Sequence, residues 1–309
     1  MIEIKLGSEK QTFDQAMAAC IGYFDGFHLG HQSLFNKTLS IAKRNNQLSA
    51  IISFDPDPWV VIHKVPNANH LTTIEDRKRL AAALGFDVWI SIQFDEVMAN
   101  MEPLLFLQKI WDLKIENLVC GFDFKFGKNG LGDVQFLKQN EAASFHVHEV
   151  SEYQVNHEKV SSTRIKIALK NGEMELVSQL LGRYYTLHGE VVGGRQIGRK
   201  IGYPTANLEV DPEYVLPKMG VYAGFVNIDG LQFGAMISIG LNPTVKSDKL
   251  VSIEAHIFDF DRDIYHKNVD FVFVHYLRPE LKFANLDGLI GQLKLDELDS
   301  RAYLKNKRI

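Results

Sequence analysis

Apolar runs alternate with helix-like segments over the first 150 residues. Helical spacing of apolar residues predicts helices at 32–45, 76–84 and 102–113, and short apolar runs predict strands at 18–24, 48–54, 87–94, 115–124 and 145–150. Strands that alternate with helices of this length predict βαβ units and a parallel sheet. Ligands of such sheets collect beyond the carboxyl ends of the strands, so the segments that follow the strands are the candidate binding edge.

The pattern changes after residue 182. Residues 161–183 read as helix with a break at Asn171-Gly172, and from Tyr184 the apolar residues recur at every second position between glycine-rich turns. Closely spaced strands of this kind predict an antiparallel barrel, with strands at 185–194, 220–228, 231–240, 251–260 and 268–277. A last helical pattern covers residues 286–303. We therefore expect two domains, residues 1–182 and 183–309.

The composition agrees with two ordinary globular domains, and the balance of charges argues against a nucleic-acid partner. Of 309 residues, 46% are apolar and 23% are charged, enough for each domain to bury a core. Residues 1–182 hold 18 basic and 22 acidic side chains, and residues 183–309 hold 16 of each. No half has the basic excess of a nucleic-acid binder, so we expect no nucleic-acid partner.

The two cysteines and the N-terminus indicate the compartment. Cys20 and Cys120 each lie in an apolar run, which favours buried free thiols and a reducing environment. The N-terminal segment has no apolar core of a signal peptide, and no window approaches 18 consecutive apolar residues. We expect a cytoplasmic protein that does not bind membranes. The sequence does not determine its oligomeric state.

Candidate chemistry in the first half begins with GYFDGFHLGH, residues 22–31. A strand, a glycine-containing turn and a helix start follow one another here, and helix N-termini favour phosphate. His28 and His31 lie on one face of that first turn and can donate to phosphate oxygens. Two alternatives stay open at this point. The pair can bind a metal with further ligands from elsewhere, or backbone groups can satisfy both histidines.

A second motif, VSSTRIK at 160–166, puts hydroxyls and cations at another helix start. Ordinary N-capping explains one Ser or Thr at such a position. Three hydroxyls together with Arg164 and Lys166 indicate a second grip on phosphate.

In the second half, GEVVGGRQIGRKIGYPTANLE at 189–209 combines five glycines with three basic residues before a strand. Such a loop can wrap phosphates with backbone N–H groups. Thr205 and Asn207 then offer two oxygens to a hard cation such as Mg²⁺, although a plain turn before a strand is the alternative. Glu254 is an isolated acid in an apolar strand. It is a candidate general base, or else a carboxylate that faces solvent.

Four motifs in order, GYFDGFHLGHQ, FDPDP, GFDFKFGKNGLGD and SSTRIKIALKNGE, resemble the FAD synthetase module of bacterial bifunctional riboflavin kinase/FAD synthetases, which is an HxGH nucleotidyltransferase. The resemblance implies a Rossmann-like α/β domain with a parallel sheet, in which His28 and His31 act on the phosphates of ATP. The residues that it assigns to ATP are Gly22, Phe24, Asp25, Gly26, His28, Gly30, His31, Ser161, Ser162, Thr163 and Arg164. The flavin side is assigned to Phe54, Pro56, Pro58, Asp123 and Phe124.

The motifs GRQIGRKIGYPTANLE, LPKMGVYAG, GLNPTV, IEAHIFDFDRDIYH and LRPELKF resemble riboflavin kinase, again in order. This resemblance implies a six-stranded flavokinase barrel with a C-terminal helix, where Thr205 and Asn207 hold Mg²⁺ and ATP. Glu254 would activate the terminal ribityl hydroxyl of riboflavin. The residues assigned to ATP or flavin here are Gly193, Gly194, Arg195, Gly198, Arg199, Gly202, Pro204, Thr205, Asn207 and Arg278.

Together the two resemblances imply ATP-dependent conversion of riboflavin to FMN and of FMN to FAD, with release of pyrophosphate. Some positions depart from the family pattern. Asp57 stands where many relatives have His, Lys166 stands for Arg, His266 for Gly, and Tyr23 for a small polar residue. Asp57 is expected to place a negative charge near bound phosphate and to lower the affinity for FMN.

Overall fold

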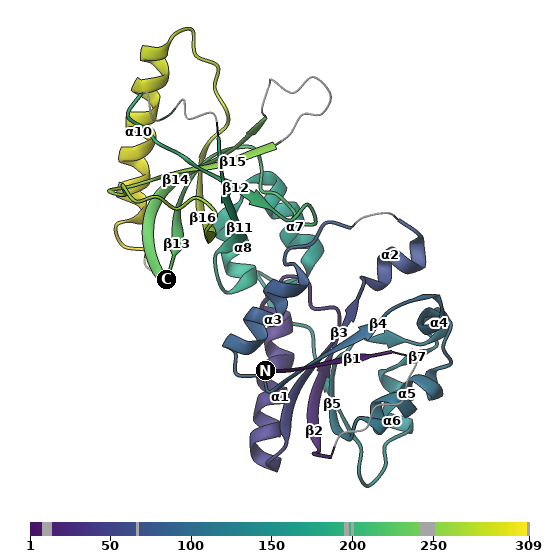
Figure 1. Cartoon of the computed structure of the whole chain (residues 1–309). Helices are drawn as coiled ribbons and strands as arrows, with labels where there is room; N and C mark the ends of the chain where they lie inside the picture. Colours follow the sequence, from purple (N-terminus) through teal and green to yellow (C-terminus); the bar gives the residue numbers. More distant parts are fainter. Residues whose placement is uncertain (8–13, 66–67, 195–197, 199–200, 242–250, 308–309) are drawn as a thin grey trace. The chain divides into compact units, whose positions relative to one another are not determined.

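The structure is a computed structural model that describes residues 1–7, 14–65, 68–194, 198, 201–241 and 251–307. The chain divides into two compact units, residues 1–162 and 163–309 (Figure 1). The first unit contains β1 (Ile2–Leu6), β2 (Met17–Ile21), α1 (Leu29–Asn45), β3 (Leu48–Asp55), α2 (Pro58–His63), α3 (Ile74–Ala83), β4 (Val88–Gln93), α4 (Glu96–Ala99), α5 (Pro103–Asp112), β5 (Ile115–Gly121), β6 (Lys125–Phe126), β7 (Gly132–Asp133), α6 (Val134–Gln139), β8 (His146–Val150), β9 (Gln154–Val155) and β10 (Glu158–Lys159).

The core of the first unit is a six-stranded sheet in the order β1-β4-β3-β2-β5-β8, with every pair parallel. This confirms the predicted parallel sheet. Its central strands are apolar without alternation because helices cover both faces; all five residues of β2 are buried. Helices α1 and α3 pack on one face, and α5 and α6 pack on the other (Figure 1). The sequence pattern missed β1, an edge strand in which only Ile4 and Leu6 are buried.

The order of the strands decides which loops meet. Strand β2 lies between β3 and β5, and the three strands run in the same direction. Their carboxyl ends therefore lie side by side, and each is followed by one of the candidate loops: residues 22–28 after β2, residues 56–57 after β3, and residues 122–124 after β5. This is the switch point at which open parallel sheets hold their ligands.

The second unit is a closed antiparallel barrel preceded by two helices, as Figure 1 shows. The barrel order is β11-β12-β15-β14-β13-β16, which confirms the predicted barrel. A long C-terminal helix, α10, packs against β13 and β14. The elements are α7 (Ser162–Asn171), α8 (Met174–Leu181), β11 (Tyr185–Val192), β12 (Ala206–Val210), β13 (Gly220–Ile228), β14 (Leu231–Leu241), β15 (Val251–Ile257), β16 (Asn268–Arg278) and α10 (Leu286–Leu304).

Helix α8 is tied to the barrel through Glu175. Its carboxylate accepts hydrogen bonds from Tyr303 on α10 at 2.7 Å and from the His275 imidazole on β16 at 2.5 Å. Burial raises the pKa of Glu175, but these two hydrogen bonds outweigh it and hold the pKa below its usual value. The ring of His275 also stacks on Tyr303, with centroids 4.2 Å apart. Four residues of α8 are buried as well, so this helix belongs to the compact second unit.

Two candidate active sites

The backbone of the turn after β2 has positive φ angles at Phe24 and Gly26. Gly26 has φ +84°, and a Cβ there would lie 2.6 Å from the Leu71 side chain. Phe24 also has positive φ, and its ring is buried against Phe35 at 5.0 Å between centroids. Phe24 therefore contributes core packing with its side chain, and any contact it makes with ATP has to come from its backbone.

Asp25 fastens this turn to the segment before α3. Its Oδ1 accepts hydrogen bonds from the backbone N–H groups of Leu71 at 2.7 Å and Thr72 at 3.2 Å. In return the Thr72 hydroxyl accepts from the Gly26 N–H at 2.9 Å. These bonds fix the position of the glycine turn, so the predicted ATP residue Asp25 has a structural task within the chain.

His28 and His31 stand at the start of α1. His28 is the N-cap, and its Nδ1 accepts the N–H of His31 at 3.3 Å. The two rings stack with centroids 3.5 Å apart. A Cβ on Gly30 would lie 3.1 Å from the His28 ring, so glycine leaves the room that this arrangement needs. Within the described ranges, no group of three or more His, Cys, Asp or Glu side chains could hold a metal ion, so the metal alternative for this pair gains no support.

The motif at residues 160–166 begins beside the same turn. The Ser162 hydroxyl donates to the backbone oxygen of Asp25 at 2.8 Å, across 137 positions of sequence. The Val160 carbonyl oxygen lies 3.5 Å from the place of a Gly30 Cβ. The first unit thus brings the glycine turn together with Val160 and Ser162, and Ser161 lies between these two. Thr163 and Arg164 follow directly in the first turn of α7.

The predicted flavin residues differ in their burial and in their contacts. The Phe54 ring is buried and packs edge-to-face on Phe94, which makes it a core residue. Pro56 is exposed and Pro58 is the first residue of α2. After β5, the carboxylate of Asp123 forms an ion pair with Lys159 at 2.5 Å.

Phe124 completes this set. It is half-buried, and its ring stacks on Phe126 with centroids 5.6 Å apart.

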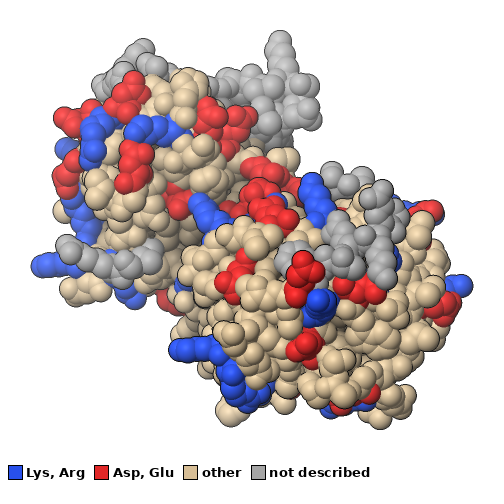
Figure 2. All heavy atoms as spheres, turned by 60° about the horizontal axis from the view of Figure 1, so that its bottom comes forward, with Lys and Arg blue, Asp and Glu red and all other residues tan. Residues whose placement is uncertain are grey.

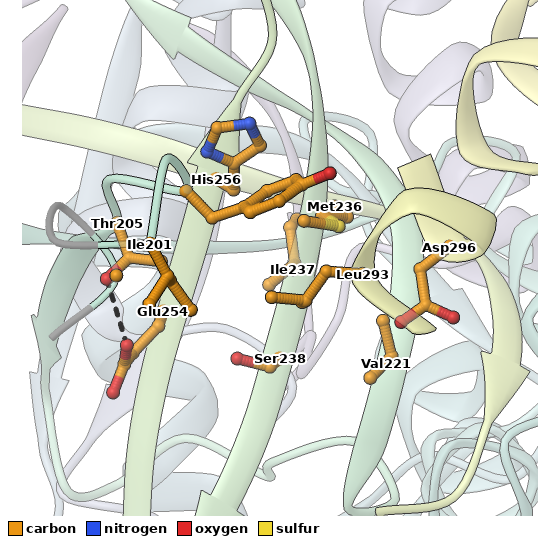
Figure 3. Close-up of a pocket in the computed structure, with 12 residues that line it drawn as sticks. Ile201, Thr205, Val221, Met236, Ile237, Ser238, Glu254, His256, Leu293 and Asp296 are labelled. Carbon is orange, nitrogen blue, oxygen red and sulfur yellow. Dashed lines mark hydrogen bonds between the residues drawn. The ribbon is translucent and has the colours of Figure 1, made fainter. Parts of the chain in front are cut away.

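The second unit contains a cavity of about 180 Å³ at one side of the barrel (Figure 3). The Thr205 hydroxyl, one residue before β12, donates to Glu254 Oε2 on β15 at 3.0 Å. The side chains of both residues point toward one another at the cavity edge. The lining residues are Gly198, Ile201, Tyr203, Thr205, Val221, Met236, Ile237, Ser238, Glu254, His256, Leu293 and Asp296.

Asn207 lies directly opposite Glu254 in the pairing of β12 with β15. Its side-chain amide occupies the space next to Gly194, where a Cβ would come within 2.1 Å of Asn207 Nδ2. The glycine loop and the strand therefore touch at this pair.

The remaining predicted loop residues are placed as follows. Gly198 accepts the N–H of Tyr203 at 2.8 Å, Gly202 has φ +84°, and the Pro204 carbonyl oxygen lies 2.8 Å from His256 Nδ1. Gly193 is exposed at the end of β11. Arg195 and Arg199 lie outside the described residues.

Arg278 does not line the cavity itself, but it contacts Asp296, which does. Its guanidinium forms a two-pronged pair with Asp296 of α10, Nε to Oδ1 at 2.8 Å and Nη2 to Oδ2 at 2.6 Å. Asp296 is buried and lines the cavity, whereas Arg278 supports it from behind. Sequence reasoning missed Asp296 and Tyr203. Asp296 stands among Lys294, Glu297 and Asp299 in the same helix, so no signal in the sequence distinguished it.

Both halves of the chain are similar to known protein families. A family model described as FAD synthetase matches residues 10–164, and one described as riboflavin kinase matches residues 181–304. The bifunctional riboflavin kinase/FMN adenylyltransferase of Listeria monocytogenes is 39% identical over 285 residues, which cover 92% of this chain and 91% of the relative. The chain belongs to the bifunctional riboflavin kinase/FMN adenylyltransferase family.

Two further proteins are similar over nearly the whole chain. The family member from Bacillus subtilis is 33% identical and covers 93% of this chain and 92% of its own length. A crystal structure described as a macrolide-efflux protein from Streptococcus pneumoniae has a TM-score of 0.88 and 30% identity, over 97% of this chain and 99% of that one. The FAD synthetase model matches most of the first unit, and the riboflavin kinase model matches most of the second.

Proposed function

We propose that this chain phosphorylates riboflavin to FMN with ATP and then transfers the adenylyl group of a second ATP to FMN, which yields FAD and pyrophosphate. The boundary that we propose between the two activities is residue 182. The observation that carries the proposal is that each unit matches one family model and gathers a set of polar groups: the glycine turn with Ser162 in one, and Thr205 with Glu254 in the other. ATP and flavins are the substrates that the family implies.

In the kinase site, Glu254 is the proposed general base. Its carboxylate lies at the cavity edge and is oriented by the Thr205 hydroxyl. When the terminal ribityl hydroxyl of riboflavin attacks the γ-phosphate, the carboxylate accepts the proton of that hydroxyl. The glycine loop before Thr205 then holds the phosphates in line with the attacking oxygen, since phosphoryl transfer depends mainly on positioning and charge neutralisation.

Thr205 and Asn207 are the residues that we propose for Mg²⁺. The Thr205 hydroxyl oxygen and the Asn207 amide oxygen are hard donors, and the Glu254 carboxylate is adjacent to both through its hydrogen bond and its strand pairing. This donor set fits Mg²⁺, which takes few protein oxygens and completes its shell with phosphate and water. The ion supplies charge neutralisation on the phosphates when it is bound.

In the adenylyltransferase site, His28 and His31 are the proposed donors to the phosphates of ATP. The N-cap position of His28 puts its ring at the positive end of α1, beside the first turn of the helix. As the FMN phosphate attacks the α-phosphate, the imidazoles and the helix start stabilise the charge that develops there. Ser161, Ser162, Thr163 and Arg164 hold the leaving pyrophosphate from the other side.

The partners that we propose are small molecules: riboflavin, FMN and ATP, without nucleic acid or membrane, in the cytoplasm. On the face shown in Figure 2, the coloured acidic and basic side chains are intermixed over both units, a pattern that favours neither polyanion nor lipid surfaces. In the described part of the chain, no helix has the length and apolar character of a membrane span.

Gly194→Ala is expected to lower kcat/KM for riboflavin phosphorylation by about ten- to hundred-fold, because the new methyl group must displace the Asn207 amide and a shift of about 1 Å has effects of this size. FMN adenylylation by the same sample should not change. Gly291→Ala is the matched control, since a Cβ there meets nothing within 4 Å. Unchanged phosphorylation in Gly194→Ala would remove Asn207 from the proposed site.

The two activities are tested by incubating the full chain with riboflavin, ATP and MgCl₂ and separating the products by chromatography. We expect FMN first, then FAD and pyrophosphate, and no product after chelation of the metal. Absence of both flavin nucleotides would refute the proposal. Binding of flavin without turnover would favour a regulatory protein that keeps both folds, and adenylylation of a different phosphate compound alone would favour another nucleotidyltransferase.

A further inference from the structure

A buried histidine that no motif includes lies between the two substrate loops of the first unit. His70 precedes the Leu71-Thr72 pair that Asp25 holds, and its side chain is 7% exposed. The Tyr23 hydroxyl approaches the edge of this imidazole, 3.2 Å from Nε2 and 3.4 Å from Nδ1. His70 therefore contacts the beginning of the glycine turn directly.

Two carboxylates face the same imidazole. His70 Nδ1 lies 3.8 Å from Asp57 Oδ2 and 4.0 Å from Asp25 Oδ2, and these acids are 14% and 6% exposed. Carboxylates buried to this degree are stable only when positive charge or hydrogen bonds compensate them. Asp25 has its backbone N–H partners, and Asp57 has the N–H of Trp59 at 2.8 Å.

In the described part of the chain, Arg77 and Tyr23 are two further charged or titratable groups beside this cluster. Arg77 stacks on the Tyr23 ring at 4.4 Å and donates to the Tyr23 carbonyl oxygen at 2.7 Å and to the Ser53 hydroxyl at 3.3 Å. Its charge is directed at the turn and at the end of β3. Burial, only partly offset by Arg77, raises the pKa of Tyr23, so this hydroxyl stays protonated and brings no negative charge.

We propose that His70 is the positively charged counterion of Asp57, and that it thereby sets the affinity of the adenylyltransferase site for the phosphate of FMN. This inference rests on the proposed assignment of residues 54–58 to the flavin side. The negative charge of Asp57 would repel the phosphate dianion of FMN held at this loop. An imidazolium 3.8 Å away cancels that charge and keeps Asp57 as the N-cap of α2.

The proposal predicts a suppressor relationship that structural damage does not produce. His70→Gln leaves Asp57 negative and uncompensated, so the KM for FMN in adenylylation should rise about tenfold or more. The KM for ATP should stay within about twofold, because the bonds of Asp25 and Thr72 to the turn remain. Adding Asp57→Asn to His70→Gln should bring the KM for FMN back toward the wild-type value, since Asn keeps the helix cap without the charge.

The experiment uses the full chain and measures kcat and both KM values for adenylylation in His70→Gln, Asp57→Asn and the double variant. His146→Gln, an exposed histidine of β8, is the matched control. Riboflavin phosphorylation in each sample reports on the integrity of the protein. A double variant that is as poor as His70→Gln, or worse, overturns the proposal, as does an unchanged KM for FMN in His70→Gln.

Two further outcomes are informative in themselves. If His70→Gln does not fold, Asp57→Asn alone still tests the proposal. This variant should have a KM for FMN equal to or below the wild-type value. A rise of several-fold in that KM contradicts the proposal. If His28→Ala leaves adenylylation intact, the site assignment itself is wrong, and this result is independent of the order of KM values among the His70 variants.

Discussion

Glu254→Gln should abolish riboflavin phosphorylation, with kcat lower by about 10²- to 10⁴-fold, while FMN adenylylation continues at the wild-type rate. The substitution keeps the size of the side chain and an oxygen that can still accept from the Thr205 hydroxyl, 3.0 Å away in the native protein. It removes only the ability to take a proton from the ribityl hydroxyl. Product analysis with riboflavin and, separately, with FMN as the substrate measures the two activities independently.

The control for this variant is Glu209→Gln, an exposed acid on the neighbouring strand β12. It should leave both activities unchanged. Phosphorylation that persists in Glu254→Gln at close to the native rate would show that Glu254 is not the base. The carboxylate would then act only in orienting Thr205.

His28→Ala should have the opposite selectivity. We expect kcat for FMN adenylylation to fall by about 10²- to 10³-fold, because a donor to the charge that develops on the α-phosphate is lost, while riboflavin phosphorylation stays at its native level. His28 also caps α1, and removal of an N-cap destabilises a protein by about 1 kcal/mol, so the measurement needs a variant that separates the two effects.

His28→Asn serves this purpose. Asparagine is among the best N-cap residues, so the helix start is preserved while the imidazole is absent. Equal loss of adenylylation in His28→Ala and His28→Asn would assign the effect to chemistry. Full activity in His28→Asn would assign His28 to capping alone, and loss of both activities in either variant would indicate misfolding.

The periodicity of the sequence was enough for the architecture because the main elements are strongly patterned. The five-residue run of β2, buried at every position, and the alternation along β11 are both typical of strands. Elements with a weak pattern of apolar residues were not predicted from the sequence. Strand β1 buries only two side chains, and α2 buries none of its residues, so neither leaves a clear apolar period.

For the sites, the sequence supplied residues but not their surroundings. Motifs predicted that His28 and Ser162 serve one site, and the hydrogen bond from Ser162 to Asp25 puts the two motifs side by side. No motif indicated that the Phe54 ring faces the core, or that Arg278 is engaged by Asp296. His70 lies in no motif at all. Such contacts join segments whose distance in sequence says nothing about their distance in space.

The division of the chain within α7 has a practical consequence for anyone who wishes to isolate the barrel. A fragment that began at the first barrel strand would lack α8, and with it the apolar side chains of Val177, Leu180 and Leu181 and the carboxylate that joins His275 to Tyr303. The apolar surface beneath α8 would become exposed to water and prone to aggregation. A self-sufficient piece therefore has to start near residue 163, about one helical hairpin earlier than the border between the two strand patterns indicates.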